Sequence, residues 1–95
     1  MVLDVSKIRG IGEYKIKNEP TRDIYFRGQL AFLVMHRNTI EVRCDARLSE
    51  VLKAKYESVM ESRYYGRGGI EIVLAGQLSQ QEIEDLIRLS YNLTQ

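Results

Sequence analysis

The sequence contains very few of the residues from which proteins build disulfides and metal sites. Its 95 residues include one cysteine, Cys44, and one histidine, His36. A single cysteine cannot form an intramolecular disulfide, and a structural zinc site needs several cysteine or histidine ligands. We therefore expect no disulfide, no metal and no cofactor. So low a cysteine content is typical of the reducing cytoplasm.

Long apolar segments are also lacking. No apolar run approaches the ~18 residues that a membrane-spanning helix requires. The first residues, Met1 to Asp4, do not show the basic and then apolar pattern of a secretion signal. The sequence therefore predicts a cytoplasmic protein with no membrane partner.

The composition is that of one folded domain, with 44% hydrophobic and 28% charged residues. The net charge is +1, but its distribution is uneven: residues 1–67 have a balance of +4 and residues 68–95 a balance of −3. A modest basic surface can attract phosphate. A charge of this size spread over 67 residues is more often an ordinary solvated surface.

The last quarter of the chain gives the strongest structural signal. Residues 70–74 alternate as a strand that Gly76 ends, and Ser79 and Glu82 have the spacing of a helix capping box. Beyond the cap, apolar side chains recur at the spacing of one helix face, at Ile83, Leu86, Ile87, Ser90 and Tyr91. This segment predicts a strand followed directly by a capped helix.

The middle of the chain predicts three strands and a helix. Residues 22–43 have the pattern of a three-stranded meander, with tight turns at Gly28-Gln29 and Arg37-Asn38. Asp45 is a predicted N-cap for a helix over 46–56. The apolar stripe of this helix is predicted to consist of Leu48, Val51, Leu52 and Tyr56.

Residues 59–65 predict a further strand, and Gly66 to Gly69 predict the turn into strand 70–74. Before the meander, residues 13–17 read as a short strand or an extended arm, and Ser6 is a candidate cap for one helical turn. We therefore predict an N-terminal arm (1–20) and one α+β domain (21–95). The domain has two layers, a five-stranded antiparallel sheet with helices over one face, and its order is three strands, a helix, two strands and a helix.

Four segments stand in a characteristic order: residues 30–34, residues 40–45 leading into the helix with Leu48 and Leu52, residues 62–64, and residues 73–78 before the capped helix. In this order and spacing, over about residues 23 to 94, the chain resembles the MmcQ/YjbR family of small bacterial proteins. The resemblance implies a CyaY-like fold and a double-wing surface that binds DNA. None of the matching segments is catalytic.

Candidate catalytic groups are few. Cys44 precedes a helix N-terminus, where a thiol can have a lowered pKa, but a buried filler is the commoner role. His36 reads as a turn histidine. Glu82 and Asp85 share a helix face, where a solvated acidic face is favoured over acid–base chemistry.

One cluster suggests binding. Arg63, Tyr64, Tyr65 and Arg67 surround the predicted hairpin tip, where arginine can neutralise phosphate and tyrosine can stack on a base. Further cations that could extend this footprint are Arg37, Arg27, Arg22 and Lys53. The alternative is an ordinary polar hairpin in which Tyr64 packs inward.

These observations favour a small non-enzymatic binding module with nucleic acid as the leading ligand. The alternative is a protein–protein interaction or self-associating module, including a homodimer. No cluster of residues supports an enzyme.

Overall fold

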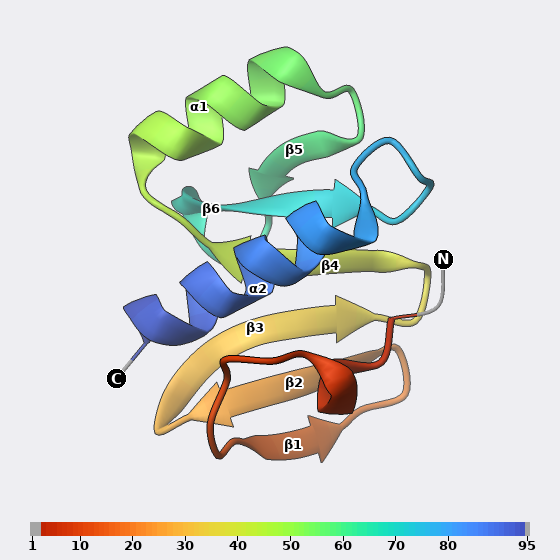
Figure 1. The fold of residues 1–95 in the computed structure, drawn as a ribbon, viewed down its shortest axis with the longest axis vertical. Coiled ribbons are helices and arrows are strands. Elements are labelled where there is room, and N and C mark those ends of the chain that lie inside the picture. The colour runs from red at the N-terminus through yellow and green to blue at the C-terminus, as the bar shows by residue number, and fades with distance from the viewer. Residues whose placement is uncertain (1–2, 95) are drawn as a thin grey trace.

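The computed structural model describes residues 3–94, which form a six-stranded antiparallel sheet and two α-helices (Figure 1). Along the chain the elements are the 3₁₀-helix η1 (Val5–Lys7), β1 (Lys15–Asn18), β2 (Arg22–Arg27), β3 (Gln29–Met35), β4 (Thr39–Arg43), α1 (Ala46–Lys55), β5 (Val59–Ser62), β6 (Gly66–Val73) and α2 (Gln80–Leu93). The predicted α+β class and the two helices are confirmed.

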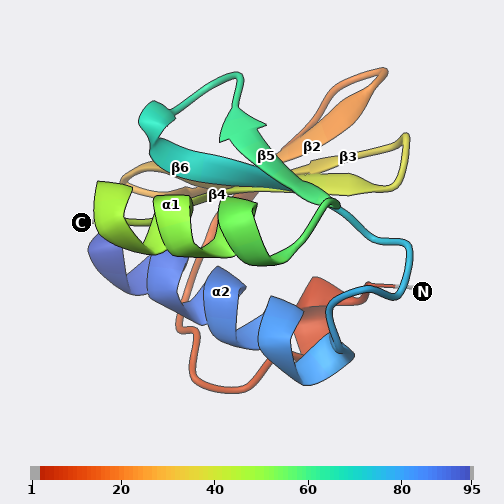
Figure 2. The same ribbon diagram turned by 90° about the horizontal axis from the view of Figure 1, so that it is seen from above.

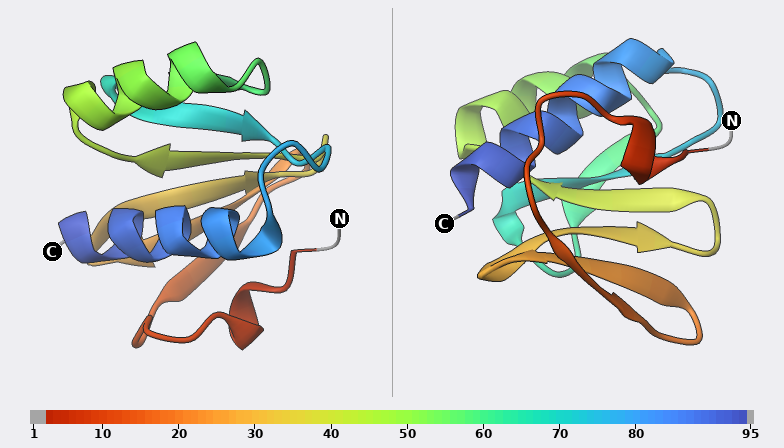
Figure 3. Two further views of the ribbon diagram at one scale, coloured as in Figure 1. Left: turned by 45° about the horizontal axis from the view of Figure 1, so that its top comes forward. Right: turned by 60° about the horizontal axis from the view of Figure 1, so that its bottom comes forward.

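The sheet has the strand order β1-β2-β3-β4-β6-β5, and every neighbouring pair is antiparallel. Both α-helices lie on the same face of the sheet (Figure 2). Further views show the N-terminal segment running from η1 past α2 before it enters β1 (Figure 3). Within residues 3–94 no helix covers the opposite face, which we call the helix-free face.

The predicted five-stranded sheet is wrong, because the N-terminal arm supplies a sixth strand. β1 pairs with β2 from Lys15↔Phe26 to Asn18↔Asp23. All four residues of β1 are exposed, so the segment lacks a buried apolar face. Its sequence pattern therefore could not distinguish a strand from an extended arm. The 3₁₀-helix η1 is capped by Asp4 and not by the predicted Ser6. The Asp4 carboxylate accepts a hydrogen bond from the Ser6 backbone N–H.

The main core lies between the sheet and the helices. Ile40 and Val42 of β4 and Ile70 and Ile72 of β6 are completely buried there. The predicted face of α2 is confirmed, with buried residues Ile83, Leu86, Ile87, Ser90 and Tyr91. Burying each large aliphatic side chain contributes about 1.5–3 kcal/mol, so this interface supplies most of the favourable free energy of folding.

The predicted capping box of α2 is confirmed. The Glu82 backbone N–H donates to Ser79 Oγ at 3.1 Å, and the Ser79 N–H donates to Glu82 Oε1 at 3.0 Å. Leu78 and Ile83 on either side of the cap are buried, as in a hydrophobic staple. The cap therefore fixes both the start of α2 and the direction from which the chain enters it.

Near its C-terminal end α2 is hydrogen-bonded into the sheet. The ladder between β3 and β4 reaches Phe32↔Val42, and the next two positions are Ala31 and Arg43. Ser90 Oγ lies between them: it accepts from the Arg43 N–H at 2.7 Å and donates to the Ala31 carbonyl. The helix thus replaces one rung of the ladder with its own hydroxyl group.

Helix α1 has its predicted cap but a different buried face. Asp45 Oδ1 accepts from the Leu48 N–H at 2.9 Å. Val51 is 56% exposed, so its predicted place in the apolar stripe is wrong, and Ser49 is buried instead. Ser49 lies close to Gly69, to whose carbonyl its hydroxyl donates at 3.4 Å. Ser49 thus packs directly against the backbone of β6.

The second hairpin turns earlier than predicted. Its turn consists of residues 63–65, and Gly66 already belongs to β6. Gly66 has the positive φ of 59° that begins the new strand. Gly69 is required for a different reason, since a Cβ there would lie 2.5 Å from the Val42 carbonyl oxygen and 2.7 Å from Tyr65 Cβ. Gly69 therefore marks a close approach to the neighbouring strand, whereas Gly66 supplies the backbone conformation that ends the turn.

We predict that Ser79→Ala lowers the free energy of unfolding by ~1 kcal/mol through loss of the cap. Ile83→Ala should lower it by ~2–5 kcal/mol, because it opens a cavity in the core. Urea denaturation measures both, and Asn92→Ala, at an exposed position of the same helix, is the control. Negligible effects of both substitutions would contradict the role assigned to this helix.

Candidate functional site

The hairpin tip that carries the candidate cluster is held against the sheet by a buried carboxylate. Glu41, in the middle of β4, is 3% exposed. Its Oε1 accepts from the Ser62 hydroxyl at 2.7 Å and from the Tyr64 backbone N–H at 3.0 Å. Ser62 Oγ in turn accepts from the Tyr65 N–H at 2.8 Å. Residues 63–65 are therefore fixed by side chains, with no need of a ligand to order them.

The two tyrosines of the cluster have different surroundings. Tyr64 is 55% exposed, and its ring meets that of Tyr65 edge-on with 5.0 Å between the centroids. The Tyr65 hydroxyl donates to the Leu30 carbonyl at 3.2 Å, and the Arg43 guanidinium lies 4.9 Å from the centre of its ring. Burial raises the pKa of Tyr65. Tyr64, and not Tyr65, thus has a ring face that a ligand can reach, the reverse of the inward packing considered for Tyr64.

A single row of side chains crosses the helix-free face from one edge of the sheet to the other. Directly opposed partners in successive strand pairs point to the same face. The row consists of Lys17, Ile24, Leu33, Glu41, Glu71 and Met60, one residue from each strand in spatial order. Ile24 and Leu33 are buried, so this face has a small apolar floor of its own. Two carboxylates lie side by side at the end of that floor.

Two arginines from distant turns converge on Glu71. Arg37 Nη2 lies 3.0 Å from Glu71 Oε2, and Arg63 Nε lies 3.5 Å from Glu71 Oε1. The carboxylate is 2% exposed, whereas the side chains of Arg37 and Arg63 are 48% and 70% exposed. The structure therefore brings together two of the predicted site residues that are separated by 26 positions in the sequence.

Arg67 is exposed near the start of β6, and it forms no ion pair with any residue of the part of the chain that the structure describes. The cations considered for a wider footprint are engaged locally. Arg22 pairs with Glu19 at 2.7 Å, and Lys53 pairs with Glu50 at 3.0 Å. Their charges are therefore balanced by neighbouring acids.

Arg27 belongs to a different part of the molecule. Its guanidinium lies 4.4 Å from the centre of the Tyr91 ring, and Nη1 donates to the Tyr91 carbonyl at 3.0 Å. Tyr91 is part of α2, so Arg27 lies on the helix-covered face of the sheet. The structure thus separates Arg27 from Arg37 and Arg63.

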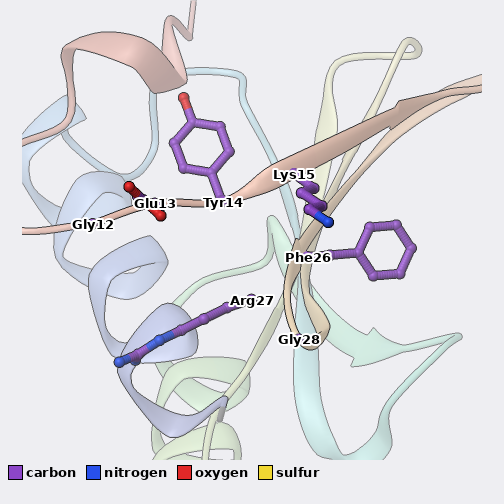
Figure 4. A pocket seen from close by; sticks show the side chains of 7 residues that line it. All are labelled: Gly12, Glu13, Tyr14, Lys15, Phe26, Arg27 and Gly28. Carbon is purple, nitrogen blue, oxygen red and sulfur yellow. The ribbon is translucent and has the colours of Figure 1, made fainter.

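An open groove of about 710 Å³ lies beside Arg27, where β1 parts from β2 (Figure 4). Its lining residues are Gly12, Glu13, Tyr14, Lys15, Phe26, Arg27 and Gly28. The ladder ends at Lys15↔Phe26, and beyond it the Tyr91 hydroxyl donates to the Glu13 carbonyl at 2.9 Å. Figure 4 shows the side chains of Tyr14 and Arg27 pointing away from each other. The groove therefore lacks a converging set of polar side chains.

Sequence reasoning missed Glu41, Glu71 and Ser62, which position the cluster. The available signal was an acidic residue between two β-branched apolar residues in each strand, in Ile40-Glu41-Val42 and in Ile70-Glu71-Ile72. Alternation placed both acids on the face opposite Ile40 and Ile72, and such a face is normally solvated. Their burial depends on contacts with the second hairpin and the β3–β4 turn, which local patterns do not contain.

The candidate catalytic groups are not brought together. Burial raises the pKa of the Cys44 thiol to about 11. His36 lies before β4 and Cys44 after it, so the length of this strand, roughly 16 Å, separates them. His36 Nε2 instead lies at hydrogen-bonding distance from Asp23 Oδ1, at 3.2 Å. Residues 3–94 contain no group of three or more histidine, cysteine or acidic residues arranged to hold a metal ion.

The two acids of α2 have structural partners. Hydrogen bonds from the Ser79 backbone and the Tyr56 hydroxyl hold the pKa of Glu82 below its usual range. A hydrogen bond from Arg88 does the same for the pKa of Asp85. Both groups are therefore ionised at neutral pH, where neither is a proton donor.

We predict that Cys44 reacts slowly with a thiol reagent at neutral pH, because both burial and the raised pKa keep it from forming an accessible thiolate. Ellman's reagent, with and without denaturant, measures this reactivity. In the folded protein the rate should increase with pH towards about 11. Fast labelling at neutral pH without denaturant would contradict the assignment of Cys44 as a buried filler.

The chain has been compared with protein-family models, with curated proteins and with solved structures, and it matches none of them. The resemblance to the MmcQ/YjbR family therefore stays a prediction from the sequence. None of the helices within residues 3–94 has the length and apolar character needed to cross a membrane.

Proposed function

We propose that this chain is a non-enzymatic cytoplasmic module that binds nucleic acid on the helix-free face of its sheet. The observation that carries the proposal is the convergence of Arg37 and Arg63 on this face, next to the exposed ring of Tyr64. The resemblance to the MmcQ/YjbR family predicts the same class of ligand.

The proposed binding residues make two kinds of contact, ionic contacts with phosphates and stacking on a base. Arg37, Arg63 and Arg67 contact phosphates, which hold the strand without reading its sequence. Tyr64 stacks on a base, and an aromatic ring accepts any base because every base has a π-face. A base is free to stack only where it is unpaired, so the proposal favours a single strand over a duplex.

Tyr65 has a structural role in this proposal. Its hydroxyl is hydrogen-bonded to the Leu30 carbonyl and its ring packs against Arg43, so it fixes the turn to the sheet. Arg27 takes no part in binding, because it is stacked on Tyr91 on the other face.

The second candidate is a protein-interaction module, and the exposed edge of β1 favours it. Residues 15–18 form an edge strand whose outer backbone groups can pair with another strand. Lys15 and Lys17 would repel the same strand of a second copy, so an acidic partner is favoured over a homodimer. Sedimentation equilibrium that shows a stable dimer would favour self-association instead.

We predict that Arg63→Ala and Arg67→Ala each weaken binding to single strands of any sequence by a similar factor. Each should also reduce the slope of log K against log salt by about one unit, because each lost phosphate contact releases fewer counterions. Tyr64→Ala should weaken binding with little change of slope, since stacking is worth ~1–3 kcal/mol and is not ionic. Fluorescence polarisation of labelled single strands and duplexes across a salt series measures these effects.

The matched control is Arg47→Ala, which removes an exposed arginine from α1 on the helix-covered side. It should leave binding almost unchanged. If the wild-type protein binds neither single strand nor duplex at low salt and roughly tens of micromolar protein, where non-specific association is measurable, the nucleic-acid proposal fails.

A further inference from the structure

The two buried carboxylates of the helix-free face are directly opposed across neighbouring strands. Glu41 and Glu71 are Cα partners in the β4–β6 ladder, and both are almost fully buried. Like charges in this arrangement repel each other, so each carboxylate needs compensating partners. The partners of the two are of different kinds.

Glu41 is satisfied by neutral donors, the Ser62 hydroxyl and the Tyr64 N–H. The Glu71 carboxylate is compensated by two ion pairs, with Arg37 at 3.0 Å and with Arg63 at 3.5 Å. The contact with Arg63 is an ion pair but not a hydrogen bond, and Glu71 Oε1 accepts no hydrogen bond within the described residues although it is buried. The pair between Arg63 and Glu71 is therefore the loosest contact of the group.

Each arginine also has unused donors. A guanidinium carries five N–H groups in a planar fork, and the hydrogen bond between this arginine pair and Glu71 is donated by Arg37 Nη2. Because the side chains of Arg37 and Arg63 are 48% and 70% exposed, a ligand can reach their guanidinium groups. A phosphate has more acceptor oxygens than a carboxylate and can engage two guanidinium groups at once.

We propose that Arg37 and Arg63 form a phosphate clamp whose internal counterion is Glu71. In the free protein the Glu71 carboxylate pairs with both arginines, and a nucleic-acid phosphate takes over Arg63 when it binds. This inference rests on the proposed function and names the group that is recognised. It also explains how two exposed arginines can be held in place without a bound anion.

The charges of the site set its strength. Glu41 and Glu71 together balance Arg37 and Arg63, so the four side chains have no net charge. An incoming phosphate is therefore attracted less than two exposed arginines alone would attract it. Removing the charge of Glu71 leaves the clamp with one uncompensated positive charge.

The alternative role for Glu71 is only to orient the arginines, and the two roles predict effects of opposite sign. The variant Glu71→Gln keeps the shape of the side chain but removes its charge. If Glu71 is a counterion, this variant should bind a fluorescently labelled oligothymidylate about three- to tenfold more tightly than the wild type, with a salt slope steeper by about one unit. If Glu71 only orients the arginines, binding should weaken.

Glu61→Gln is the matched control. It makes the same change of net charge on β5, but Glu61 lies 3.9 Å from Lys53 of α1 and is paired with Ile70, so it faces the helices. It should change affinity far less than Glu71→Gln. In an Arg63→Ala background the gain from Glu71→Gln should shrink, because the two substitutions act on the same contact.

A measurement on the wild-type protein covers the case in which Glu71→Gln does not fold, which thermal denaturation would reveal. The side-chain Nε–H signal of Arg63 should shift during an NMR titration with oligothymidylate, while that of Arg47 should not. An unmoved Arg63 signal in a protein that binds would overturn the clamp.

The outcomes separate the two proposals. Binding that depends on Arg63 and Arg67 but is unchanged or weakened by Glu71→Gln overturns the counterion role alone. Binding by Glu71→Gln where the wild type shows none overturns the proposed function and the clamp with it, because the natural protein then does not bind nucleic acid. Absence of binding by both proteins overturns the clamp together with the proposed function.

Discussion

The fold depends on the way in which α2 is fastened to the centre of the sheet. The Ser90 hydroxyl stands where β3 and β4 would otherwise bond to each other, and it serves both strands at once. Leaving a buried polar group without its partner costs about 1–3 kcal/mol, so a helix displaced from this position would lose more than apolar contacts. With α2 fixed here and α1 beside it, both helices occupy one face of the sheet and leave the other uncovered by any helix of the described residues.

Patterns within a single element allowed the correct prediction of α2. The capping box, the apolar residues beside it and the helical face agree with one another, and all depend on residues a few positions apart. The meander was equally accessible, because Asn38 is tolerant of the positive φ that its turn requires, and it adopts a φ of 68°. Local information was enough for these elements.

The errors arose where distant contacts decide. β1 has no buried side chain and is a strand only because β2 provides a partner. The buried face of α1 depends on packing against β6, where the carbonyl that Ser49 contacts lies twenty positions later in the chain. In the candidate site, the residue types at positions 63–67 and 37 could be found from the sequence. Their arrangement could not, since it depends on two acids from different strands that a local pattern assigns to solvent.

The contact between Gly69 and Tyr65 has a consequence for how this chain can change over evolution. The ring of Tyr65 fills the space that a side chain at position 69 would need, and the Val42 carbonyl closes the remaining side. Aromatic residues that cover a glycine in a sheet compensate for the missing side chain. The residue types at positions 65 and 69 are therefore coupled. A side chain at position 69 requires both a smaller residue at position 65 and a shift of β4.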